Sequence, residues 1–334
     1  MGGTKQRKLN FNGFKLFFKL VLVNSLSVLS ISCLSMSAVN IAVRAFRKLE
    51  PEDLQILQAI EQQMKNYEHA PKDAIHKQAE LPLSEIEYRL PILIKKGLLR
   101  GWRGKYTGYS LTTAGYDTLA IDTLVKANII EAFGKPLGVG KESDVYDALT
   151  PNEKRVALKF HRLGRTSFKK TKLKRNYTVN YSYTPDWHHR SRIAAKKEYT
   201  ALKLLYPKGV AVPEPIKQTR HVLVMSMIEG AELYHYPELP DAQAVYNETL
   251  VNVRRAYQDA HIIHGDLSPF NIILQPNQHI LIIDWPQNVP TTHPNAKELL
   301  ERDVRNVLTF FQRKHGLKNR LKDAVTYVTE NTKN

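Results

Sequence analysis

The chain has 334 residues, of which 43% are hydrophobic, and this is enough for two globular domains with buried cores. Its 49 Lys and Arg against 32 Asp and Glu give a net charge of +17, which indicates a polyanionic partner such as nucleic acid or an acidic membrane surface. The single cysteine, Cys33, excludes an intramolecular disulfide and a cysteine-based metal site, and it fits a reducing, cytoplasmic location.

Residues 1–45 are predicted to form a hydrophobic and basic extension. The 24 residues from Leu20 to Val43 carry no charge and follow several basic residues, which is the outline of a signal peptide or membrane anchor. However, eight of the 24 are Ser or Asn, and no small-residue cleavage site follows. Because Met36 precedes a more ordinary sequence, we favour a start site placed too far upstream, or a poorly ordered extension, over an anchor or a structured helix. We therefore expect no membrane partner.

Residues 46–130 have the pattern of a winged helix-turn-helix module. Helices are predicted over 50–68 and 71–79, and a third helix from an N-cap at Ser84 to a C-cap at Gly97. The segments LLRGW and YSLT predict a two-stranded hairpin, and TTAGYDTLAIDTLVKA predicts a further helix. Such modules bind nucleic acid, although they also serve as protein-docking surfaces.

The third helix of this module is the expected recognition element. Proline in a helix interior removes a hydrogen bond, so Pro91 should kink this helix. The basic side chains available for phosphate contacts near the end of the helix and in the wing are Lys95, Lys96, Arg100 and Arg103.

A phosphate-binding loop and its lysine are predicted next. In PLGVGKESDVYDALT, Gly138 and Gly140 let backbone amides approach phosphate oxygens and Ser143 adds a donor, although taken alone this stretch is more often an ordinary glycine hairpin. The following strand, RVALKFH, contains a V-A-x-K motif whose lysine, Lys159, would bind the α and β phosphates. Because a buried lysine needs a carboxylate, we expect Glu198, in the helix RIAAKKEYTALKLLY, to be its partner.

The catalytic residues are predicted at one edge of a strand-turn-strand unit. The segment HVLVMSMIEG should form a hinge in which the main chain of Ser226 and Ile228 meets adenine. The unit HGDLSPFNIILQPNQHILIIDW then presents three polar residues at its two ends. Asp266 can accept or orient the proton of the acceptor, Asn271 can bind a divalent ion, and Asp284 can bridge that ion to the phosphates.

Several parts of an ordinary protein kinase are missing. Gly265 stands where the arginine of H-R-D is usual, and Ser268 replaces a lysine that peptide kinases use beside the substrate. Only fifty residues follow Asp284, and they contain no A-P-E motif, so an activation segment with peptide-docking helices is not expected. Arg302 and Asp303, in the last helix pair, are predicted to be structural.

The chain resembles the RIO-type atypical kinases of the second Rio subfamily. The motifs that carry the resemblance are GVGKESDVY, VALKFHRLGRTSFKK, AAKKEY, HGDLSPFN and IIDWPQ, and the absence of a long tail resembles archaeal members. The resemblance implies an α+β fold in which a winged helix-turn-helix precedes a truncated, bilobal kinase domain. The expected division is an extension at 1–45, the winged helix at 46–130 and the kinase domain at 131–334, with lobes at 131–228 and 229–334.

The resemblance also implies an ATP- and Mg²⁺-dependent serine/threonine kinase or ATPase that matures the small ribosomal subunit, with Mn²⁺ as an alternative ion. Asp266, Lys159 and Asp284 would be catalytic, and Asn271 and Asp284 would hold the metal. The nucleotide would be bound by Gly138, Gly140, Lys141, Ser143, Lys159, Glu198, Ser226 and Ile228. The alternatives are a small-molecule phosphotransferase of the aminoglycoside or choline kinase type, because HGD and IDW occur there too, and a non-catalytic RNA-binding protein.

The expected partners are a small-subunit precursor with its rRNA, and a protein phospho-acceptor or the chain itself. The RNA would be bound by the winged helix and by the basic segment 154–197, which holds fourteen basic and one acidic side chain. A solvated basic loop is the plain alternative for that segment. His188 and His189 are expected to face solvent or RNA.

Overall fold

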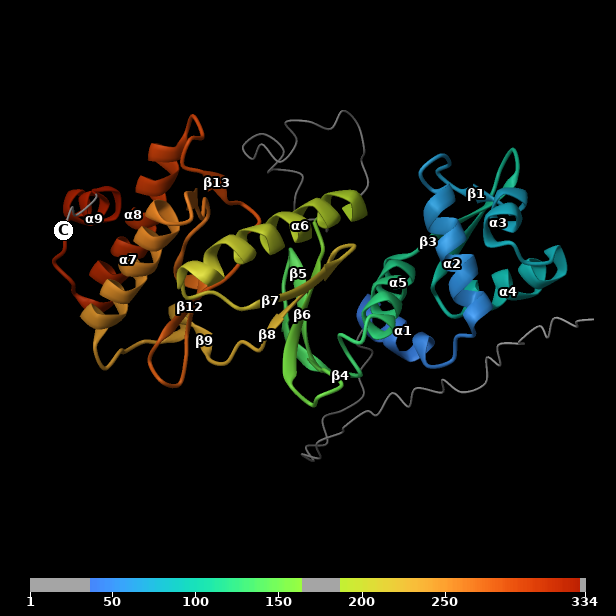
Figure 1. Ribbon diagram of the computed structural model, residues 1–334, viewed down its shortest axis with the longest axis horizontal. Coiled ribbons are helices and arrows are strands. Elements are labelled where there is room, and N and C mark those ends of the chain that lie inside the picture. The colour runs from blue at the N-terminus through green and yellow to red at the C-terminus, as the bar shows by residue number, and fades with distance from the viewer. Residues whose placement is uncertain (1–36, 164–186, 331–334) are drawn as a thin grey trace, which may run out of the picture.

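The computed structural model describes residues 37–163 and 187–330 (Figure 1). Most of the predicted extension, residues 1–36, lies outside the described residues, and so do 164–186 of the basic segment and 331–334. Within the described ranges, no helix combines the length and the apolar character needed to cross a membrane.

The N-terminal module is a winged helix-turn-helix, as predicted. Its three strands form an antiparallel sheet in the order β1-β3-β2, and β2 and β3 are the wing hairpin. The elements of the module are α1 (Ala38–Phe46), α2 (Pro51–Gln63), β1 (Ala70–Pro71), α3 (Lys72–Ala79), α4 (Leu83–Lys95), β2 (Leu99–Arg103), β3 (Thr107–Leu111) and α5 (Thr113–Lys126).

Helix α4 differs from its expected form at the N-terminus. Pro82, not Ser84, occupies the N-cap, because its backbone (φ −52°, ψ 143°) is extended just before the first helical residue, Leu83. The helix then continues through Pro91 to Lys95. Gly97 follows with a φ of +76°, which is the left-handed conformation that ends many helices.

Helix α1 was not among the expected elements of the module. Its residues Val39, Ala42 and Ala45 are buried, and the helix packs against α5 (Figure 1). The hydroxyl of Ser37, at the N-cap of α1, lies 2.8 Å from the hydroxyl of Tyr146 in the next domain. Residues just before 46 therefore contribute to the core of the winged-helix module.

The N-terminal lobe of the kinase domain is a five-stranded antiparallel sheet with a long helix across one face (Figure 1). The strand order is β4-β5-β6-β8-β7, and the helix is α6. The elements are β4 (Ala132–Val139), β5 (Ser143–Leu149), β6 (Arg155–His161), α6 (Trp187–Leu205), the 3-10 turn η2 (Tyr206–Lys208), β7 (Pro215–Thr219) and β8 (Val222–Ser226).

The C-terminal lobe is mainly helical, with short strand pairs that carry the catalytic loop. After β12 the described chain forms only the short strand β13 before the last two helices, which agrees with the predicted lack of peptide-docking helices. The elements are β9 (Ala231–Glu232), η3 (Leu233–His235), α7 (Ala242–Gln258), β10 (Ile262–Ile263), η4 (Pro269–Asn271), β11 (Ile272–Leu274), β12 (Ile280–Ile282), β13 (Val289–Pro290), α8 (Ala296–His315) and α9 (Leu321–Thr329).

Strand β6 lies between two hydrophobic cores because successive side chains of a strand point to opposite faces. Val156, Leu158 and Phe160 belong to a core shared with the winged helix, whereas Ala157 belongs to a core shared with α6 and the C-terminal lobe. Lys159, two residues after Ala157, points to the same face of the strand as Ala157. The nucleotide side and the winged-helix side of the lobe are thus two faces of the same strand.

Candidate active site

Lys159 is held by two carboxylates from different parts of the chain. Its Nζ donates to Oε1 of Glu198 on α6 and to Oδ1 of Asp284 after β12, each at 2.7 Å. The predicted pair of Lys159 and Glu198 is therefore present. Both residues are buried, but 31% of the Asp284 side chain is exposed. This second carboxylate can therefore turn toward a ligand.

The charges in this cluster hold one another ionised. Burial lowers the pKa of Lys159, but Asp284 and Glu198 outweigh burial and raise that pKa above its ordinary value. Burial raises the pKa of Glu198, but the charge of Lys159 and a neighbouring His161 outweigh it and lower the pKa to about 2. Nε2 of His161 lies 2.9 Å from Oε2 of Glu198. The Lys159 ammonium is consequently charged at neutral pH and can bind phosphate.

The predicted phosphate loop is the turn between β4 and β5. The amide of Gly140 donates to the carbonyl of Ser143 at 2.8 Å, which closes the turn. A Cβ built on Gly138 would meet nothing within 4 Å, and Lys141 is exposed. The backbone there is open to an approaching phosphate, as a phosphate-covering loop requires.

Hydrogen bonds to Glu214 restrict which main-chain group of Ser226 could make the predicted contact with adenine. The amide of Ser226 donates to the carbonyl of Glu214 at 2.9 Å, and its hydroxyl accepts from the Glu214 amide at 3.0 Å. Only the carbonyl of Ser226 is thus left for the expected main-chain contact with adenine. Ile228 lies two residues beyond the end of β8 and is half-buried.

The catalytic loop and the strand that carries Asp284 are joined through their backbones. The Ile283 amide donates to the Asn271 carbonyl at 2.9 Å, and Nδ2 of Asn271 donates to the carbonyl of Asp266 at 2.9 Å. His264 Nε2 lies 3.0 Å from the Ile283 carbonyl oxygen. These bonds bring the three predicted catalytic residues to one edge of the β11–β12 pair.

Backbone conformation explains two residues of the motif. Gly265 has a φ of +78°, and a Cβ there would lie 2.8 Å from the carbonyl oxygen of Gln287, so a side chain such as arginine would be strained and would clash. Asp284 also has a left-handed φ, of +67°, which is uncommon outside glycine. Such conformations persist where the surrounding structure enforces them, often at functional sites.

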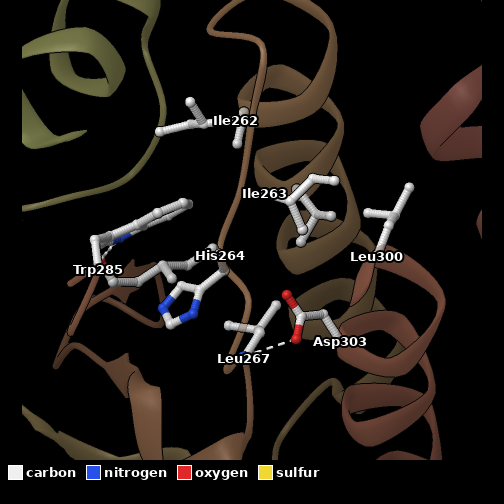
Figure 2. Close-up of a pocket in the computed structure, with 10 residues that line it drawn as sticks. Ile262, Ile263, His264, Leu267, Trp285, Leu300 and Asp303 are labelled. Carbon is white, nitrogen blue, oxygen red and sulfur yellow. Dashed lines mark hydrogen bonds between the residues drawn. The ribbon is translucent and has the colours of Figure 1, made fainter. Parts of the chain in front are cut away.

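Asp303 supports the catalytic loop from behind. Its carboxylate accepts hydrogen bonds from the amides of Gly265 at 2.7 Å and Leu267 at 3.1 Å, on either side of Asp266. Figure 2 shows it reaching from α8 toward Leu267. Burial raises its pKa, although the two amides and nearby His264 oppose that effect. The predicted structural role is thus a positioning role.

A small cavity lies behind the same loop (Figure 2). Its volume is about 10 Å³, which is room for about one water molecule, and its lining is mostly apolar. His264 and Asp303 are its polar lining residues, and the buried Trp285 closes one side, with its Nε1 donating to the Ile282 carbonyl at 3.1 Å. The cavity is too small for a nucleotide and belongs to the framework of the loop.

The donor set fits a nucleotide-bound magnesium ion. No group of three or more His, Cys, Asp and Glu in the described residues could hold a metal alone. Mg²⁺ in kinase sites needs only one or two protein ligands, because phosphates and waters supply the others. The amide of Asn271 donates through its nitrogen, which leaves its oxygen for an ion. The partly exposed Asp284 follows Ile283, whose backbone amide is bonded to the Asn271 carbonyl. A bound ion would neutralise phosphate charge.

His188 corrects an expectation of the sequence analysis. It is only 4% exposed, and its ring stacks on Tyr116 of α5 with centroids 3.6 Å apart and planes 20° apart. Burial, with smaller contributions from nearby positive groups, lowers its pKa to about 2, so the imidazole is neutral. His188 is the second residue of α6, which begins at Trp187. The first turn of that helix therefore places the ring between the winged helix and the kinase domain. No pattern in the sequence indicated this.

The fold and site define an ATP-dependent phosphotransferase of the protein-kinase class. Phosphoryl transfer uses three parts that are present here. They are a lysine paired to a helix glutamate, an open glycine turn, and an edge that carries Asp266, Asn271 and Asp284.

Comparisons with known proteins narrow this class. Residues 144–324 match the RIO domain, and residues 46–127 match the family described as Rio2, N-terminal. The chain belongs to the Rio2 family of RIO kinases. It is 37% identical to the serine/threonine-protein kinase rio2 of Schizosaccharomyces pombe, over 84% of this chain and 81% of that protein. It is 39% identical to the RIO-type serine/threonine-protein kinase Rio2 of Methanocaldococcus jannaschii, over 75% and 92%.

A solved structure agrees with this assignment. The Rio2 kinase of Chaetomium thermophilum, crystallised as an ADP/Mg²⁺-phosphoaspartate complex, superposes with a TM-score of 0.74 at 36% identity, over 87% of this chain and 90% of that one. These similarities favour a protein kinase over a small-molecule phosphotransferase. The chain is an atypical, ATP-dependent kinase.

Proposed function

We propose that the chain is a serine/threonine kinase with ATPase activity that acts on a precursor of the small ribosomal subunit. Serine/threonine specificity is taken from the names of its relatives. The ribosomal role rests on two features taken together: the described residues contain no peptide-docking helices beside the kinase site, and the chain is strongly basic and carries a winged helix. A substrate embedded in RNA would be recognised by those basic parts.

The wing supports RNA as the partner better than the expected recognition helix does. On α4, Arg89 is bound to Glu50, Asp53 and Glu85. Lys96, at the end of that helix, contacts Asp53. Arg89 and Lys96 are thus committed within the module, whereas Lys95 of this helix is exposed.

The wing hairpin, β2 to β3, has a different character. Arg100, Arg103 and Lys105 are exposed and make no ion pair with a described residue. Trp102 stacks on His69 with ring centroids 5.1 Å apart. Cations that are not neutralised next to an aromatic stack suit phosphates and unpaired bases.

The catalytic cycle proposed here uses Mg²⁺, with Mn²⁺ as an alternative, and includes a phosphorylated aspartate. The structural relative contains a phosphoaspartate with ADP and Mg²⁺. In this chain Asp284 is the candidate, because it is the partly exposed carboxylate of the two that bind Lys159. An Asp284 acyl phosphate would form as the bond to the ATP γ-phosphorus breaks and ADP leaves. Water would then release phosphate, which completes an ATPase cycle.

Co-sedimentation tests the ribosomal role. Purified full chain should co-sediment with small-subunit precursors, and ATP with Mg²⁺ should release it. Changing Arg100, Arg103 and Lys105 to Gln should weaken binding and reduce its salt dependence by roughly one ion per lost phosphate contact. As a matched control, changing the exposed C-lobe residues Lys297, Lys318 and Lys322 to Gln removes the same charge. Equal loss in both variants, or no co-sedimentation of the unaltered chain, contradicts the proposal.

A further inference from the structure

Arg162, three residues after Lys159, joins the winged helix to the kinase domain. Its guanidinium donates through two nitrogens to the two carboxylate oxygens of Asp117 on α5, at 2.8 and 2.7 Å. His221, immediately before β8, places its Nε2 2.8 Å from the same carboxylate. All three side chains are buried. Burial raises the pKa of Asp117, but Arg162 outweighs burial and lowers it, so this carboxylate is ionised.

Arg162 is also hydrogen-bonded to residues at the base of the phosphate-binding turn. Its Nε donates to Oδ2 of Asp144 at 3.1 Å, and its backbone amide donates to the Glu142 carbonyl at 2.6 Å. Asp144 is fully buried and directly follows Ser143. One side chain therefore contacts the winged helix and the strand that begins at the phosphate turn.

The turn itself has few restraints of its own. Its residues from 137 to 141 are exposed, and the space around Gly138 is open. The position of the Ser143 hydroxyl is consequently set at the base of the turn, where Arg162 contacts residues 142 and 144. A guanidinium that lost Asp117 would lose two of its three carboxylate hydrogen bonds and would shift toward Asp144.

We propose that Arg162 is a positioning residue that makes nucleotide affinity depend on the docked winged helix. Through Arg162, Asp117 of α5 holds Asp144 and hence the phosphate-binding turn in its nucleotide-competent place. The winged helix thereby acts on the ATP site without touching it. This coupling requires only the kinase activity and is independent of the ribosomal role.

Asp117→Asn tests the coupling at a residue outside the catalytic machinery. We expect a rise of about five- to tenfold in the Kd for ADP with Mg²⁺, which is within the range of coupling between linked sites. The KM for ATP should rise similarly, while kcat at saturating ATP stays within about twofold, because the catalytic residues are unchanged. Isothermal titration calorimetry of the full chain gives the affinity, and circular dichroism checks folding.

The matched control weakens another link between the same two domains, a part-buried ion pair. Arg220, between β7 and β8, binds Glu61 of α2 at 2.8 Å but makes no contact with the phosphate turn. Glu61→Gln should leave the Kd for ADP unchanged. An equal rise in both variants would show general loosening of the interface and would overturn the proposal.

A second variant keeps the test decisive if Asp117→Asn does not fold. Asp144→Asn breaks the same chain of contacts from the side of the phosphate turn. It should also raise the Kd for ADP by several fold with kcat preserved. A folded variant of either kind with unaltered affinity for ADP would refute the positioning role of Arg162.

Discussion

Lys159 on β6 and Arg162, just after the end of that strand, are both buried cations, but their carboxylate partners differ in exposure. Lys159 donates to Glu198 and Asp284, each at 2.7 Å, and Arg162 donates to Asp117 at 2.7 and 2.8 Å and to Asp144 at 3.1 Å. The Asp284 side chain is 31% exposed, whereas Asp117 and Asp144 are fully buried. Lys159 has one solvent-accessible carboxylate partner, which a phosphate could replace. The carboxylate partners of Arg162 are fully buried, so Arg162 can only have a structural role.

The comparison predicts opposite effects for the same chemical change in the two clusters. Asp284→Asn removes the partly exposed carboxylate that would hold the metal, so kcat should fall by at least about a hundredfold. Its side chain is partly solvated, so the free energy of unfolding should change by less than about 1 kcal/mol. Steady-state ADP release and urea denaturation measure the two effects.

Asp117→Asn should have the opposite effect, on stability rather than on turnover. It leaves Arg162 buried with only Asp144, and breaking a buried pair in this way should lower the free energy of unfolding by about 3 kcal/mol. Turnover at saturating ATP should stay close to that of the unaltered chain. If Asp284→Asn destabilised the protein as much as Asp117→Asn, exposure would not be what separates the two clusters.

A smaller effect is expected where a carboxylate acts on catalysis from a buried position. Asp303→Asn keeps one acceptor oxygen but replaces the other with a nitrogen that cannot accept from Gly265 or Leu267. The loop that carries Asp266 should shift slightly, and kcat should fall about tenfold, since small displacements of reacting groups are costly. The KM for ATP should change little, because the nucleotide-binding residues are not touched.

The control for this prediction lies on the same helix. Glu298→Gln alters an exposed residue in the first turn of α8 and should leave kcat unchanged. A rise in KM without a fall in kcat for Asp303→Asn would place its role in nucleotide binding rather than in positioning the catalytic loop.

What could be predicted from the sequence is what local patterns encode. The winged-helix elements follow from helical spacing and the hairpin segments, and the pair of Lys159 and Glu198 follows from the need of a buried lysine for a carboxylate. The edge with Asp266 and Asp284 follows from the strand-turn-strand unit, whose ends must point the same way. These inferences need no knowledge of which distant surfaces meet.

What could not be predicted depends on packing between distant segments. Asp117 lies in an ordinary helix and meets Arg162 only because the winged helix docks on the outer face of the sheet. Asp303 faces the catalytic loop only because α8 packs beneath it. A lone carboxylate on an amphipathic helix has no pattern that distinguishes these roles from an exposed position.

Acid should separate the two regions further. The folded pKa of His188, about 2, lies below its ordinary 6.5, so below pH 6.5 the unfolded chain takes up a proton that the folded chain does not. Stability should therefore fall by about 1.4 kcal/mol per pH unit as pH drops below 6.5. Burial lowers the pKa of His221 as well, which adds a loss of the same sign.

The catalytic cluster should resist the same acidification. The pKa of Glu198 is lowered from 4.5 to about 2, so its contribution is present above pH 4.5 and is lost only between 4.5 and about 2. His188→Phe keeps a ring against Tyr116 and removes the titration, so the slope of unfolding free energy between about pH 6.5 and pH 5 should flatten by about 1.4 kcal/mol per unit. Urea denaturation across that range measures the slope, with the exposed His235→Gln as the control. An unchanged slope in His188→Phe would mean that the interface opens before His188 is protonated.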